Sequence, residues 1–156
     1  EKPERLDPRE VMKGALGMMG EQLRLASIEV TASCDHECPI IIGHKIQLEQ
    51  VFLNLFANAR DAINENKENT DRKIVILGTP IGNHKLEISF TDTGGGIPKN
   101  ILPHVFEPFF TTKEMHKGTG LGLSVSYGII RDMGGTFKAE NVNGGARFAI
   151  TLPIAK

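Results

Sequence analysis

The sequence predicts a single two-layer α/β sandwich, in which a mixed, mostly antiparallel sheet is covered by helices on one face. Three observations carry this prediction. The 156 residues, 40% of them hydrophobic and 24% charged, suffice for one hydrophobic core. Apolar residues recur at helical spacing in long segments, and alternating segments occur in pairs around short turns. Neither internal repeats nor a low-complexity linker divides the chain, so we expect one domain over residues 1–156.

The first third of the chain is predicted to form a helix and a hairpin. Asp7 supplies an N-cap and Pro8 a favoured first helical residue, and the apolar spacing that follows predicts a helix over about 8–24. Residues 28–32 alternate between apolar and polar side chains, which predicts a short strand. We expect residues 39–42 to be its hairpin partner, across a turn that contains both cysteines.

The rest of the chain is predicted to alternate between helices and two strand pairs. Turn sequences Gly82-Asn83 and Asn143-Gly144-Gly145 lie at the centres of the two pairs. The predicted elements are a helix at 45–65, strands at 73–78 and 85–92, a helix at about 121–133, and strands at 135–140 and 146–152. A glycine-rich region over 94–122 separates the first strand pair from the last helix.

Charge and hydropathy exclude several classes of protein. The net charge of -1 and the lack of any run of five basic residues argue against nucleic-acid binding. The longest apolar stretches fall far short of the ~20 residues that a membrane-spanning helix needs, so we expect no membrane contact. The N-terminus is charged and contains Pro3 and Pro8 where a secretory signal would be apolar, so we interpret it as the edge of a larger chain.

Two cysteines, Cys34 and Cys38, are too few for a disulfide scaffold and fit a reducing cytoplasm, which is the location we expect. Together with His36 and His44 they suggest a zinc site. Their CxxxC spacing is looser than that of established zinc motifs, and we favour incidental turn residues.

A polar stripe runs along the predicted helix 45–65. Gln50, Asn54, Asn58 and Asp61 recur at spacings of four, four and three, which places them on one face. A solvated face is the simpler interpretation, but large apolar residues crowd both sides of the stripe. Asparagine is also a poor residue for a helix interior. We therefore favour a functional role, because amide oxygens on a rigid helix suit Mg2+.

The segment DTGGGIP, residues 92–98, directly follows a predicted strand. Asp92 at a strand end can accept hydrogen bonds from an exocyclic amine, and the glycines let the backbone approach a ligand closely. A simple turn is the alternative interpretation.

Glycines also open the last predicted helix, in the segment GTGLGLS of residues 118–124. Unpaired N–H groups and the helix dipole make such a segment a candidate phosphate cradle, with a flexible hinge as the alternative. It is not a P-loop, because the chain has no Gly-Lys dipeptide, and its GxGxG spacing is not a dinucleotide fingerprint.

Between the two glycine clusters lies FEPFFTTK, residues 106–113, with three phenylalanines in five positions. At least one of these rings is expected to pin the loop to the core. Aromatic anchors with glycines on either side are typical of a lid that closes over a ligand. Lys113 and Lys117 would then supply cations for phosphates.

In this order, the polar helix, DTGGGIP, FEPFFTTK, GTGLGLS and NGGARFAITLP resemble the N, G1, F, G2 and G3 boxes of the catalytic and ATP-binding domain of sensor histidine kinases. That domain belongs to the GHKL superfamily, with DNA gyrase, mismatch-repair ATPases and the large heat-shock chaperone, and has the Bergerat α/β sandwich fold. FEPFFTTK and LNLFANARDA are similar to the nitrogen-regulator-type subgroup. The resemblance covers residues from about 6 to 153.

The resemblance implies ATP and Mg2+ as cofactors. It assigns Asn58 to the metal, Asn54 to the triphosphate and metal waters, and Asp92 to the adenine amino group. With Lys113, the two asparagines are the implied catalytic residues. The implied nucleotide-binding set comprises Asn54, Asn58, Asp61, Asp92, Gly94, Gly96, Ile97, Phe110, Thr112, Lys113, Gly118, Thr119, Gly120, Leu121 and Gly122.

The implied reaction transfers the γ-phosphoryl group of Mg-ATP to a histidine on the kinase's own dimerisation domain, and from there to the receiver domain of a response regulator. That acceptor motif is absent, because no histidine has the expected sequence context; the histidines are His36, His44, His84, His104 and His116. We therefore expect a monomeric catalytic domain from a longer kinase, with residues 1–7 as the remnant of a linker from the missing helical domain.

Two departures from the family pattern affect the expected site. Many relatives have a basic residue three positions after the metal-binding asparagine, where this chain has Asp61 beside Arg60. Many also have a hydroxyl residue after Gly145, where this chain has Ala146. The first departure argues against a direct phosphate contact from that turn, and the second against one water-mediated adenine contact.

Three other functions were weighed. An anti-sigma-type serine protein kinase shares the superfamily, but FEPFFTTK argues against it. A degenerate nucleotide-binding docking module is disfavoured by the intact glycines and asparagines. Efficient ATP hydrolysis is disfavoured because Asn54 cannot abstract a proton.

Overall fold

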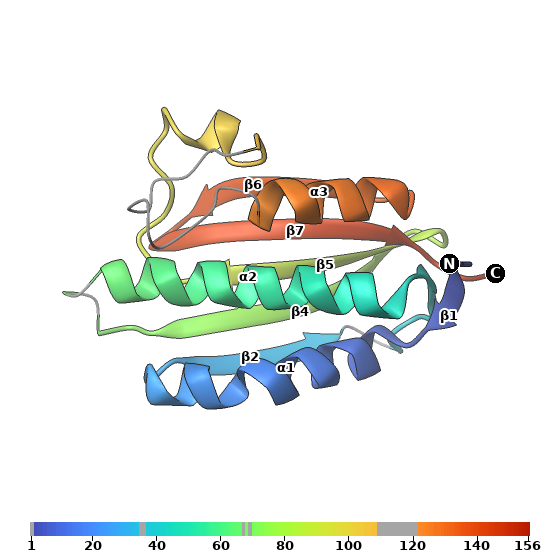
Figure 1. Ribbon diagram of the computed structural model, residues 1–156, viewed down its shortest axis with the longest axis horizontal. Coiled ribbons are helices and arrows are strands. Elements are labelled where there is room, and N and C mark those ends of the chain that lie inside the picture. Colours follow the sequence, from blue (N-terminus) through green and yellow to red (C-terminus); the bar gives the residue numbers. More distant parts are fainter. Residues whose placement is uncertain (1, 35–36, 67, 69, 109–121) are drawn as a thin grey trace.

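Five strands form one mixed sheet in the computed structural model, which describes residues 2–34, 37–66, 68, 70–108 and 122–156. The strand order is β2-β4-β5-β7-β6 (Figure 1). The strands are β2 (Glu29–Cys34), β4 (Lys73–Ile81), β5 (Lys85–Asp92), β6 (Thr136–Val142) and β7 (Gly145–Pro153). β2 and β4 are parallel and every other neighbouring pair is antiparallel, which confirms the predicted mixed, mostly antiparallel sheet.

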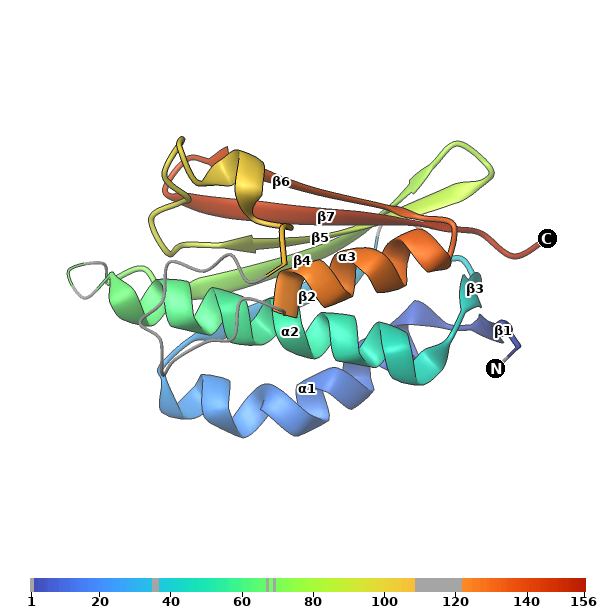
Figure 2. The same cartoon turned by 45° about the horizontal axis from the view of Figure 1, so that its top comes forward.

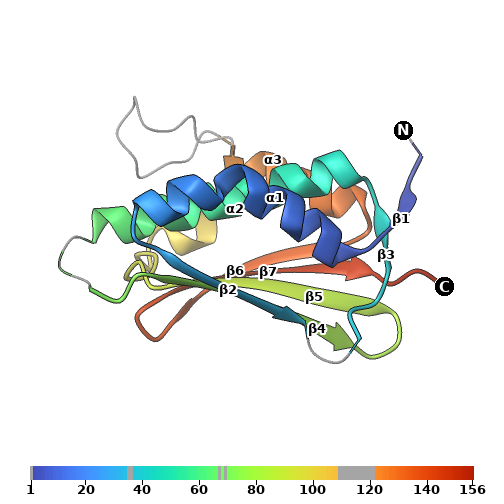
Figure 3. The same cartoon turned by 90° about the horizontal axis from the view of Figure 1, so that it is seen from below.

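Three helices cover one face of this sheet, as the sequence predicts (Figure 2 and Figure 3). They are α1 (Pro8–Leu25), α2 (Lys45–Glu65) and α3 (Gly122–Asp132), and a short 3-10 helix, η1 (Leu102–His104), follows β5. The Asp7 side chain accepts a hydrogen bond of 3.0 Å from the backbone N–H of Arg9, so it caps α1 as expected. None of the helices in the described part of the chain is long and apolar enough to cross a membrane.

The core lies between α2 and the centre of the sheet. Phe52 and Phe56, both fully buried, pack on Phe90 of β5 with ring centroids 5.7 and 5.2 Å apart. Apolar residues on both sides of the polar stripe are therefore core residues. This packing fixes the rotation of α2 and holds the stripe along one edge of the buried face.

The predicted hairpin of residues 28–32 and 39–42 is wrong. β2 pairs in parallel with β4, whereas β3 (Ile41–Gly43) pairs antiparallel with β1 (Glu4–Leu6). Alternation identifies a strand but not its partner, and β4 offers a longer partner whose Ile74 and Ile76 are buried. The connection from β2 to β4 runs through α2, which is the kind of crossover that a parallel pair requires.

Candidate functional site

Asp92, the last residue of β5, is the best-defined acidic group of the site. Its side chain is 4% exposed. Oδ1 accepts hydrogen bonds from the backbone N–H groups of Gly94, at 2.9 Å, and Ala146, at 3.3 Å. Burial raises the pKa of Asp92, and these two hydrogen bonds oppose that rise. No described residue donates a hydrogen bond to Oδ2, so this oxygen remains available to a ligand.

The glycine-rich loop after Asp92 is held by the β6–β7 hairpin. Asn141 makes two hydrogen bonds to the backbone of Ile97: its Oδ1 accepts from the N–H and its Nδ2 donates to the carbonyl, both at 2.7 Å. The N–H of Gly95 donates to the carbonyl of Gly144 at 3.2 Å. Gly95 and Gly96 have φ angles of +91° and +88°, which favour glycine.

Asn141 is absent from the site predicted from the sequence. It is 44 positions from Ile97, and the only available signal was an amide side chain near the end of a predicted strand pair.

Two further glycines permit close approach between the elements of the site. A Cβ at Gly94 would lie 2.7 Å from the Cβ of Ala62 in α2. A Cβ at Gly145 would lie 1.7 Å from the carbonyl oxygen of Asp92. Contacts this short cannot exist in a folded protein, so glycine is required for the present packing. The loop therefore lies between the end of α2 and the start of β7.

The polar stripe of α2 faces α3 at one of its predicted positions. The Asn54 Nδ2 donates to the Ser126 Oγ at 3.0 Å and to the carbonyl of Gly122 at 3.3 Å. Asn54 therefore links α2 to the first turn of α3. Asn58, one turn further along, is partly buried, and no described residue forms a hydrogen bond with its side chain. Its amide is thus free to meet a ligand.

Asp61 takes part in a local ion pair. Its Oδ1 lies 3.2 Å from the Nη2 of Arg60, and Arg60 also donates to the Oε1 of Gln22 in α1. This pairing occupies both charges beside the turn where relatives have a basic residue. It supports the expectation that this turn makes no direct phosphate contact.

One end of the FEPFF segment is anchored in the core. The ring of Phe106 lies 4.7 Å from that of Phe137 and 5.1 Å from that of Tyr127 in α3, as centroid distances. The expectation of at least one core anchor is therefore confirmed. Seven predicted ligand-binding residues lie outside the described part of the chain: Phe110, Thr112, Lys113, Gly118, Thr119, Gly120 and Leu121.

Comparison with known proteins gives consistent matches. The family described as histidine kinase-, DNA gyrase B-, and HSP90-like ATPase matches residues 43–156. The two-component sensor PprA of Pseudomonas aeruginosa is 44% identical over 150 residues, which are 96% of this chain and 16% of PprA. The sensory histidine kinase/phosphatase NtrB of Rhizobium leguminosarum bv. phaseoli is 34% identical over 140 residues, 83% of this chain and 36% of NtrB.

Solved structures agree with the fold. The catalytic domain of histidine kinase ThkA has a TM-score of 0.86 and 29% sequence identity, and the match covers 100% of both chains. ThkA in complex with the response regulator protein TrrA matches 98% of this chain and 42% of that chain, with a TM-score of 0.78 and 26% identity. The chain thus corresponds to a whole catalytic domain and to a minor part of the curated relatives.

Proposed function

Because this chain belongs to the family of histidine kinase-, DNA gyrase B-, and HSP90-like ATPases, we propose that the site between α2 and the Asp92 loop binds Mg-ATP for phosphoryl transfer. The chain is a catalytic, ATP-binding domain of the sensor histidine kinase type. The proposed reaction passes the γ-phosphoryl group to a histidine of a separate dimerisation domain in the full-length kinase. A response-regulator receiver domain is the proposed next acceptor, and the cytoplasm the proposed location.

Asp92 is the observation that carries this proposal. Its Oδ1 is fixed by two backbone amides, which orients the carboxylate and leaves Oδ2 as an acceptor in a nearly buried position. Such an acceptor matches the exocyclic amine of adenine and rejects a ring that presents a carbonyl there. Adenine is therefore the base that this site selects.

The α2 stripe is suited to the metal and phosphate side of the site. Amide oxygens are appropriate Mg2+ ligands, and the free amide of Asn58 lies one turn from Asn54 on the same helix face. We assign Asn58 to the metal. Asn54, which contacts the start of α3, is assigned to positioning phosphates at that helix N-terminus. Magnesium supplies charge neutralisation on the phosphates, and the protein's part is positioning.

Calorimetric titration with ADP and a non-hydrolysable ATP analogue, with and without Mg2+, tests the nucleotide site. Asn58→Ala is expected to weaken binding in Mg2+ by tenfold or more, about 1.4 kcal/mol, and to remove most of the magnesium enhancement. Gln50→Ala is the matched control, because Gln50 lies on the same stripe but is exposed. Folded wild type that binds neither nucleotide would contradict the proposal and favour a docking module.

Asn141→Ala tests whether the hairpin positions the adenine loop. Loss of both hydrogen bonds to Ile97 is expected to lower ADP affinity by about 1–2 kcal/mol, with little change in thermal stability because Asn141 is exposed. Asn143→Ala, in the exposed turn of the same hairpin, is the control. Equal ADP affinity in the two variants, measured by calorimetry, would show that the loop holds its conformation without Asn141.

A further inference from the structure

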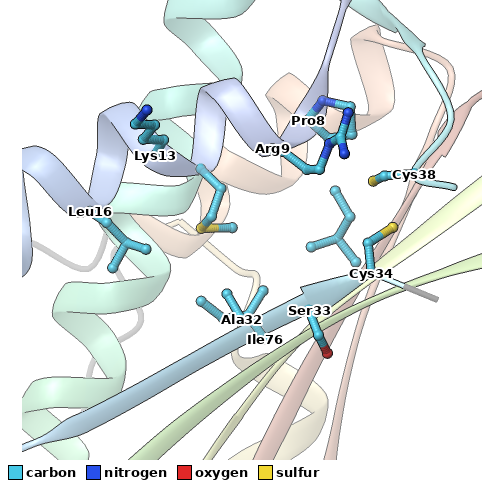
Figure 4. Close-up of a pocket in the computed structure, with 12 residues that line it drawn as sticks. Pro8, Arg9, Lys13, Leu16, Ala32, Ser33, Cys34, Cys38 and Ile76 are labelled. Carbon is cyan, nitrogen blue, oxygen red and sulfur yellow. The ribbon is translucent and has the colours of Figure 1, made fainter. Parts of the chain in front are cut away.

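An apolar groove of about 440 Å³ lies between α1 and the edge of the sheet, away from the candidate nucleotide site (Figure 4). β2 is parallel to β4, and β4 is antiparallel to β5, so β2 and β5 end at opposite ends of the sheet. Cys34 and Cys38 both line the groove, and none of the candidate nucleotide residues does. The function of these two thiols is therefore separate from nucleotide binding.

The two sulfur atoms face the same space at the end of β2 (Figure 4). Cys34, the last residue of β2, pairs with Gly78 of β4. Its Sγ lies 2.8 Å from the point that a Cβ at residue 78 would occupy, so the thiol rests over the glycine and any side chain there would displace it. Cys38 is partly buried and forms a hydrogen bond with the Cys34 side chain. Both cysteines are free thiols.

The surroundings give the two sulfurs different protonation. Burial, and next the hydrogen bond with Cys34, raise the pKa of Cys38 to about 12, although the charge of Arg9 opposes this rise. Asp7, which pairs with Arg9 at 3.0 Å, also faces Cys38 and adds to the rise. Cys38 therefore keeps its proton at neutral pH and donates it to Cys34. In this arrangement Cys34 is the sulfur that becomes the thiolate and attacks.

We propose that Cys34 and Cys38 form a reversible dithiol site that is oxidised to an intramolecular disulfide by low-molecular-weight disulfides. The Cys34 thiolate attacks one sulfur of the small disulfide, whose S–S bond breaks and releases one thiolate that takes up a proton. The Cys38 thiol then gives up its proton to solvent, and its sulfur attacks the mixed disulfide at Cys34 and releases the second small thiol. The protein loses two electrons and two protons, and the small disulfide is reduced to two thiols.

Oxidation would tie the end of β2 to the segment that leads into β3 and α2. It closes a ring over residues 34–38 and thereby restricts the unfolded chain. We expect the oxidised protein to unfold at a higher urea concentration than the reduced protein. ADP affinity is expected to stay within twofold, because the groove shares no residue with the nucleotide site.

The test treats the reduced chain with oxidised glutathione and follows intact mass. Wild type is expected to lose two hydrogens without retaining glutathione, and dithiothreitol is expected to restore the original mass. Cys38→Ser is expected to hold one glutathione on Cys34, because the second sulfur is missing. Cys34→Ser is expected to react at least tenfold more slowly.

Two results would overturn the dithiol site. One is wild type that stays reduced or accumulates glutathione adducts without forming the internal disulfide, a measurement that needs no variant. The other is equal adduct formation by the two serine variants, which would mean independent surface thiols. ADP titration of the same samples reports separately on the nucleotide site, so failure of one proposal is distinguishable from failure of the other.

Discussion

Asp92→Asn is expected to lose adenine-nucleotide binding by roughly a hundredfold while the domain stays at least as stable as wild type. The asparagine Oδ1 can still accept the hydrogen bonds from Gly94 and Ala146. Its amide nitrogen, however, replaces the free carboxylate oxygen and meets the adenine amine as donor against donor. Losing a charge-assisted hydrogen bond in a buried site costs about 3 kcal/mol.

The stability half of this prediction follows from the direction of the pKa shift. Burial raises the folded-state pKa of Asp92 above the ordinary 3.8. A raised pKa contributes stability that is present in full below the unfolded pKa and is lost as pH rises through the folded pKa. At neutral pH the buried carboxylate is thus a cost that asparagine removes. Wild type should lose stability relative to Asp92→Asn as pH rises from about 3.8 through the folded pKa.

Urea unfolding across this pH range, with ADP calorimetry at pH 7, checks both halves. Because the variant keeps the backbone contacts of Oδ1, a loss of binding in a fully folded protein would assign Asp92 to recognition of the base. ADP affinity within fivefold of wild type would place adenine elsewhere. A variant that is less stable at neutral pH would show that the carboxylate is stabilised by more than its two amide donors.

The sequence predicted local elements better than their partners. The helix 45–65 and the two hairpins were correct because period and turn chemistry are encoded in neighbouring residues. The partner of β2 was wrong because residues 29–34 carry no information on which strand will lie beside them. That choice depends on the buried face of β4, about 40 positions away in the chain, and on the crossover through α2.

The site shows the same division. Asp92 and the α2 asparagines were recognisable because strand ends, glycine runs and polar stripes are visible in one segment. Asn141 was missed because its role exists only once the hairpin folds against the loop. Gly145 was taken as a turn residue, whereas the structure makes it the point where β7 passes the backbone of Asp92. Long-range packing, not composition, assigns these two residues.

Gly145→Ala should therefore destabilise the domain strongly and lower ADP binding with it. Its Cβ would lie 1.7 Å from the carbonyl oxygen and 2.7 Å from the carbonyl carbon of Asp92, both backbone atoms that cannot rotate away. Relief requires the start of β7 to move from the end of β5, at a cost of about 3 kcal/mol. The same movement would break the hydrogen bond from the Ala146 N–H to Asp92.

Two other glycines separate this clash from the general effect of adding a methyl group. Gly17→Ala, in α1 with nothing within 4 Å of the new Cβ, is expected to stabilise by up to about 1 kcal/mol. Gly144→Ala, also in open space but with φ at +80°, is expected to cost only about 1–2 kcal/mol of backbone strain. Urea unfolding should thus rank Gly17→Ala above wild type, then Gly144→Ala, then Gly145→Ala. If Gly144→Ala were the least stable, strain in the turn, and not the approach of β7 to Asp92, would be what the glycine pair protects.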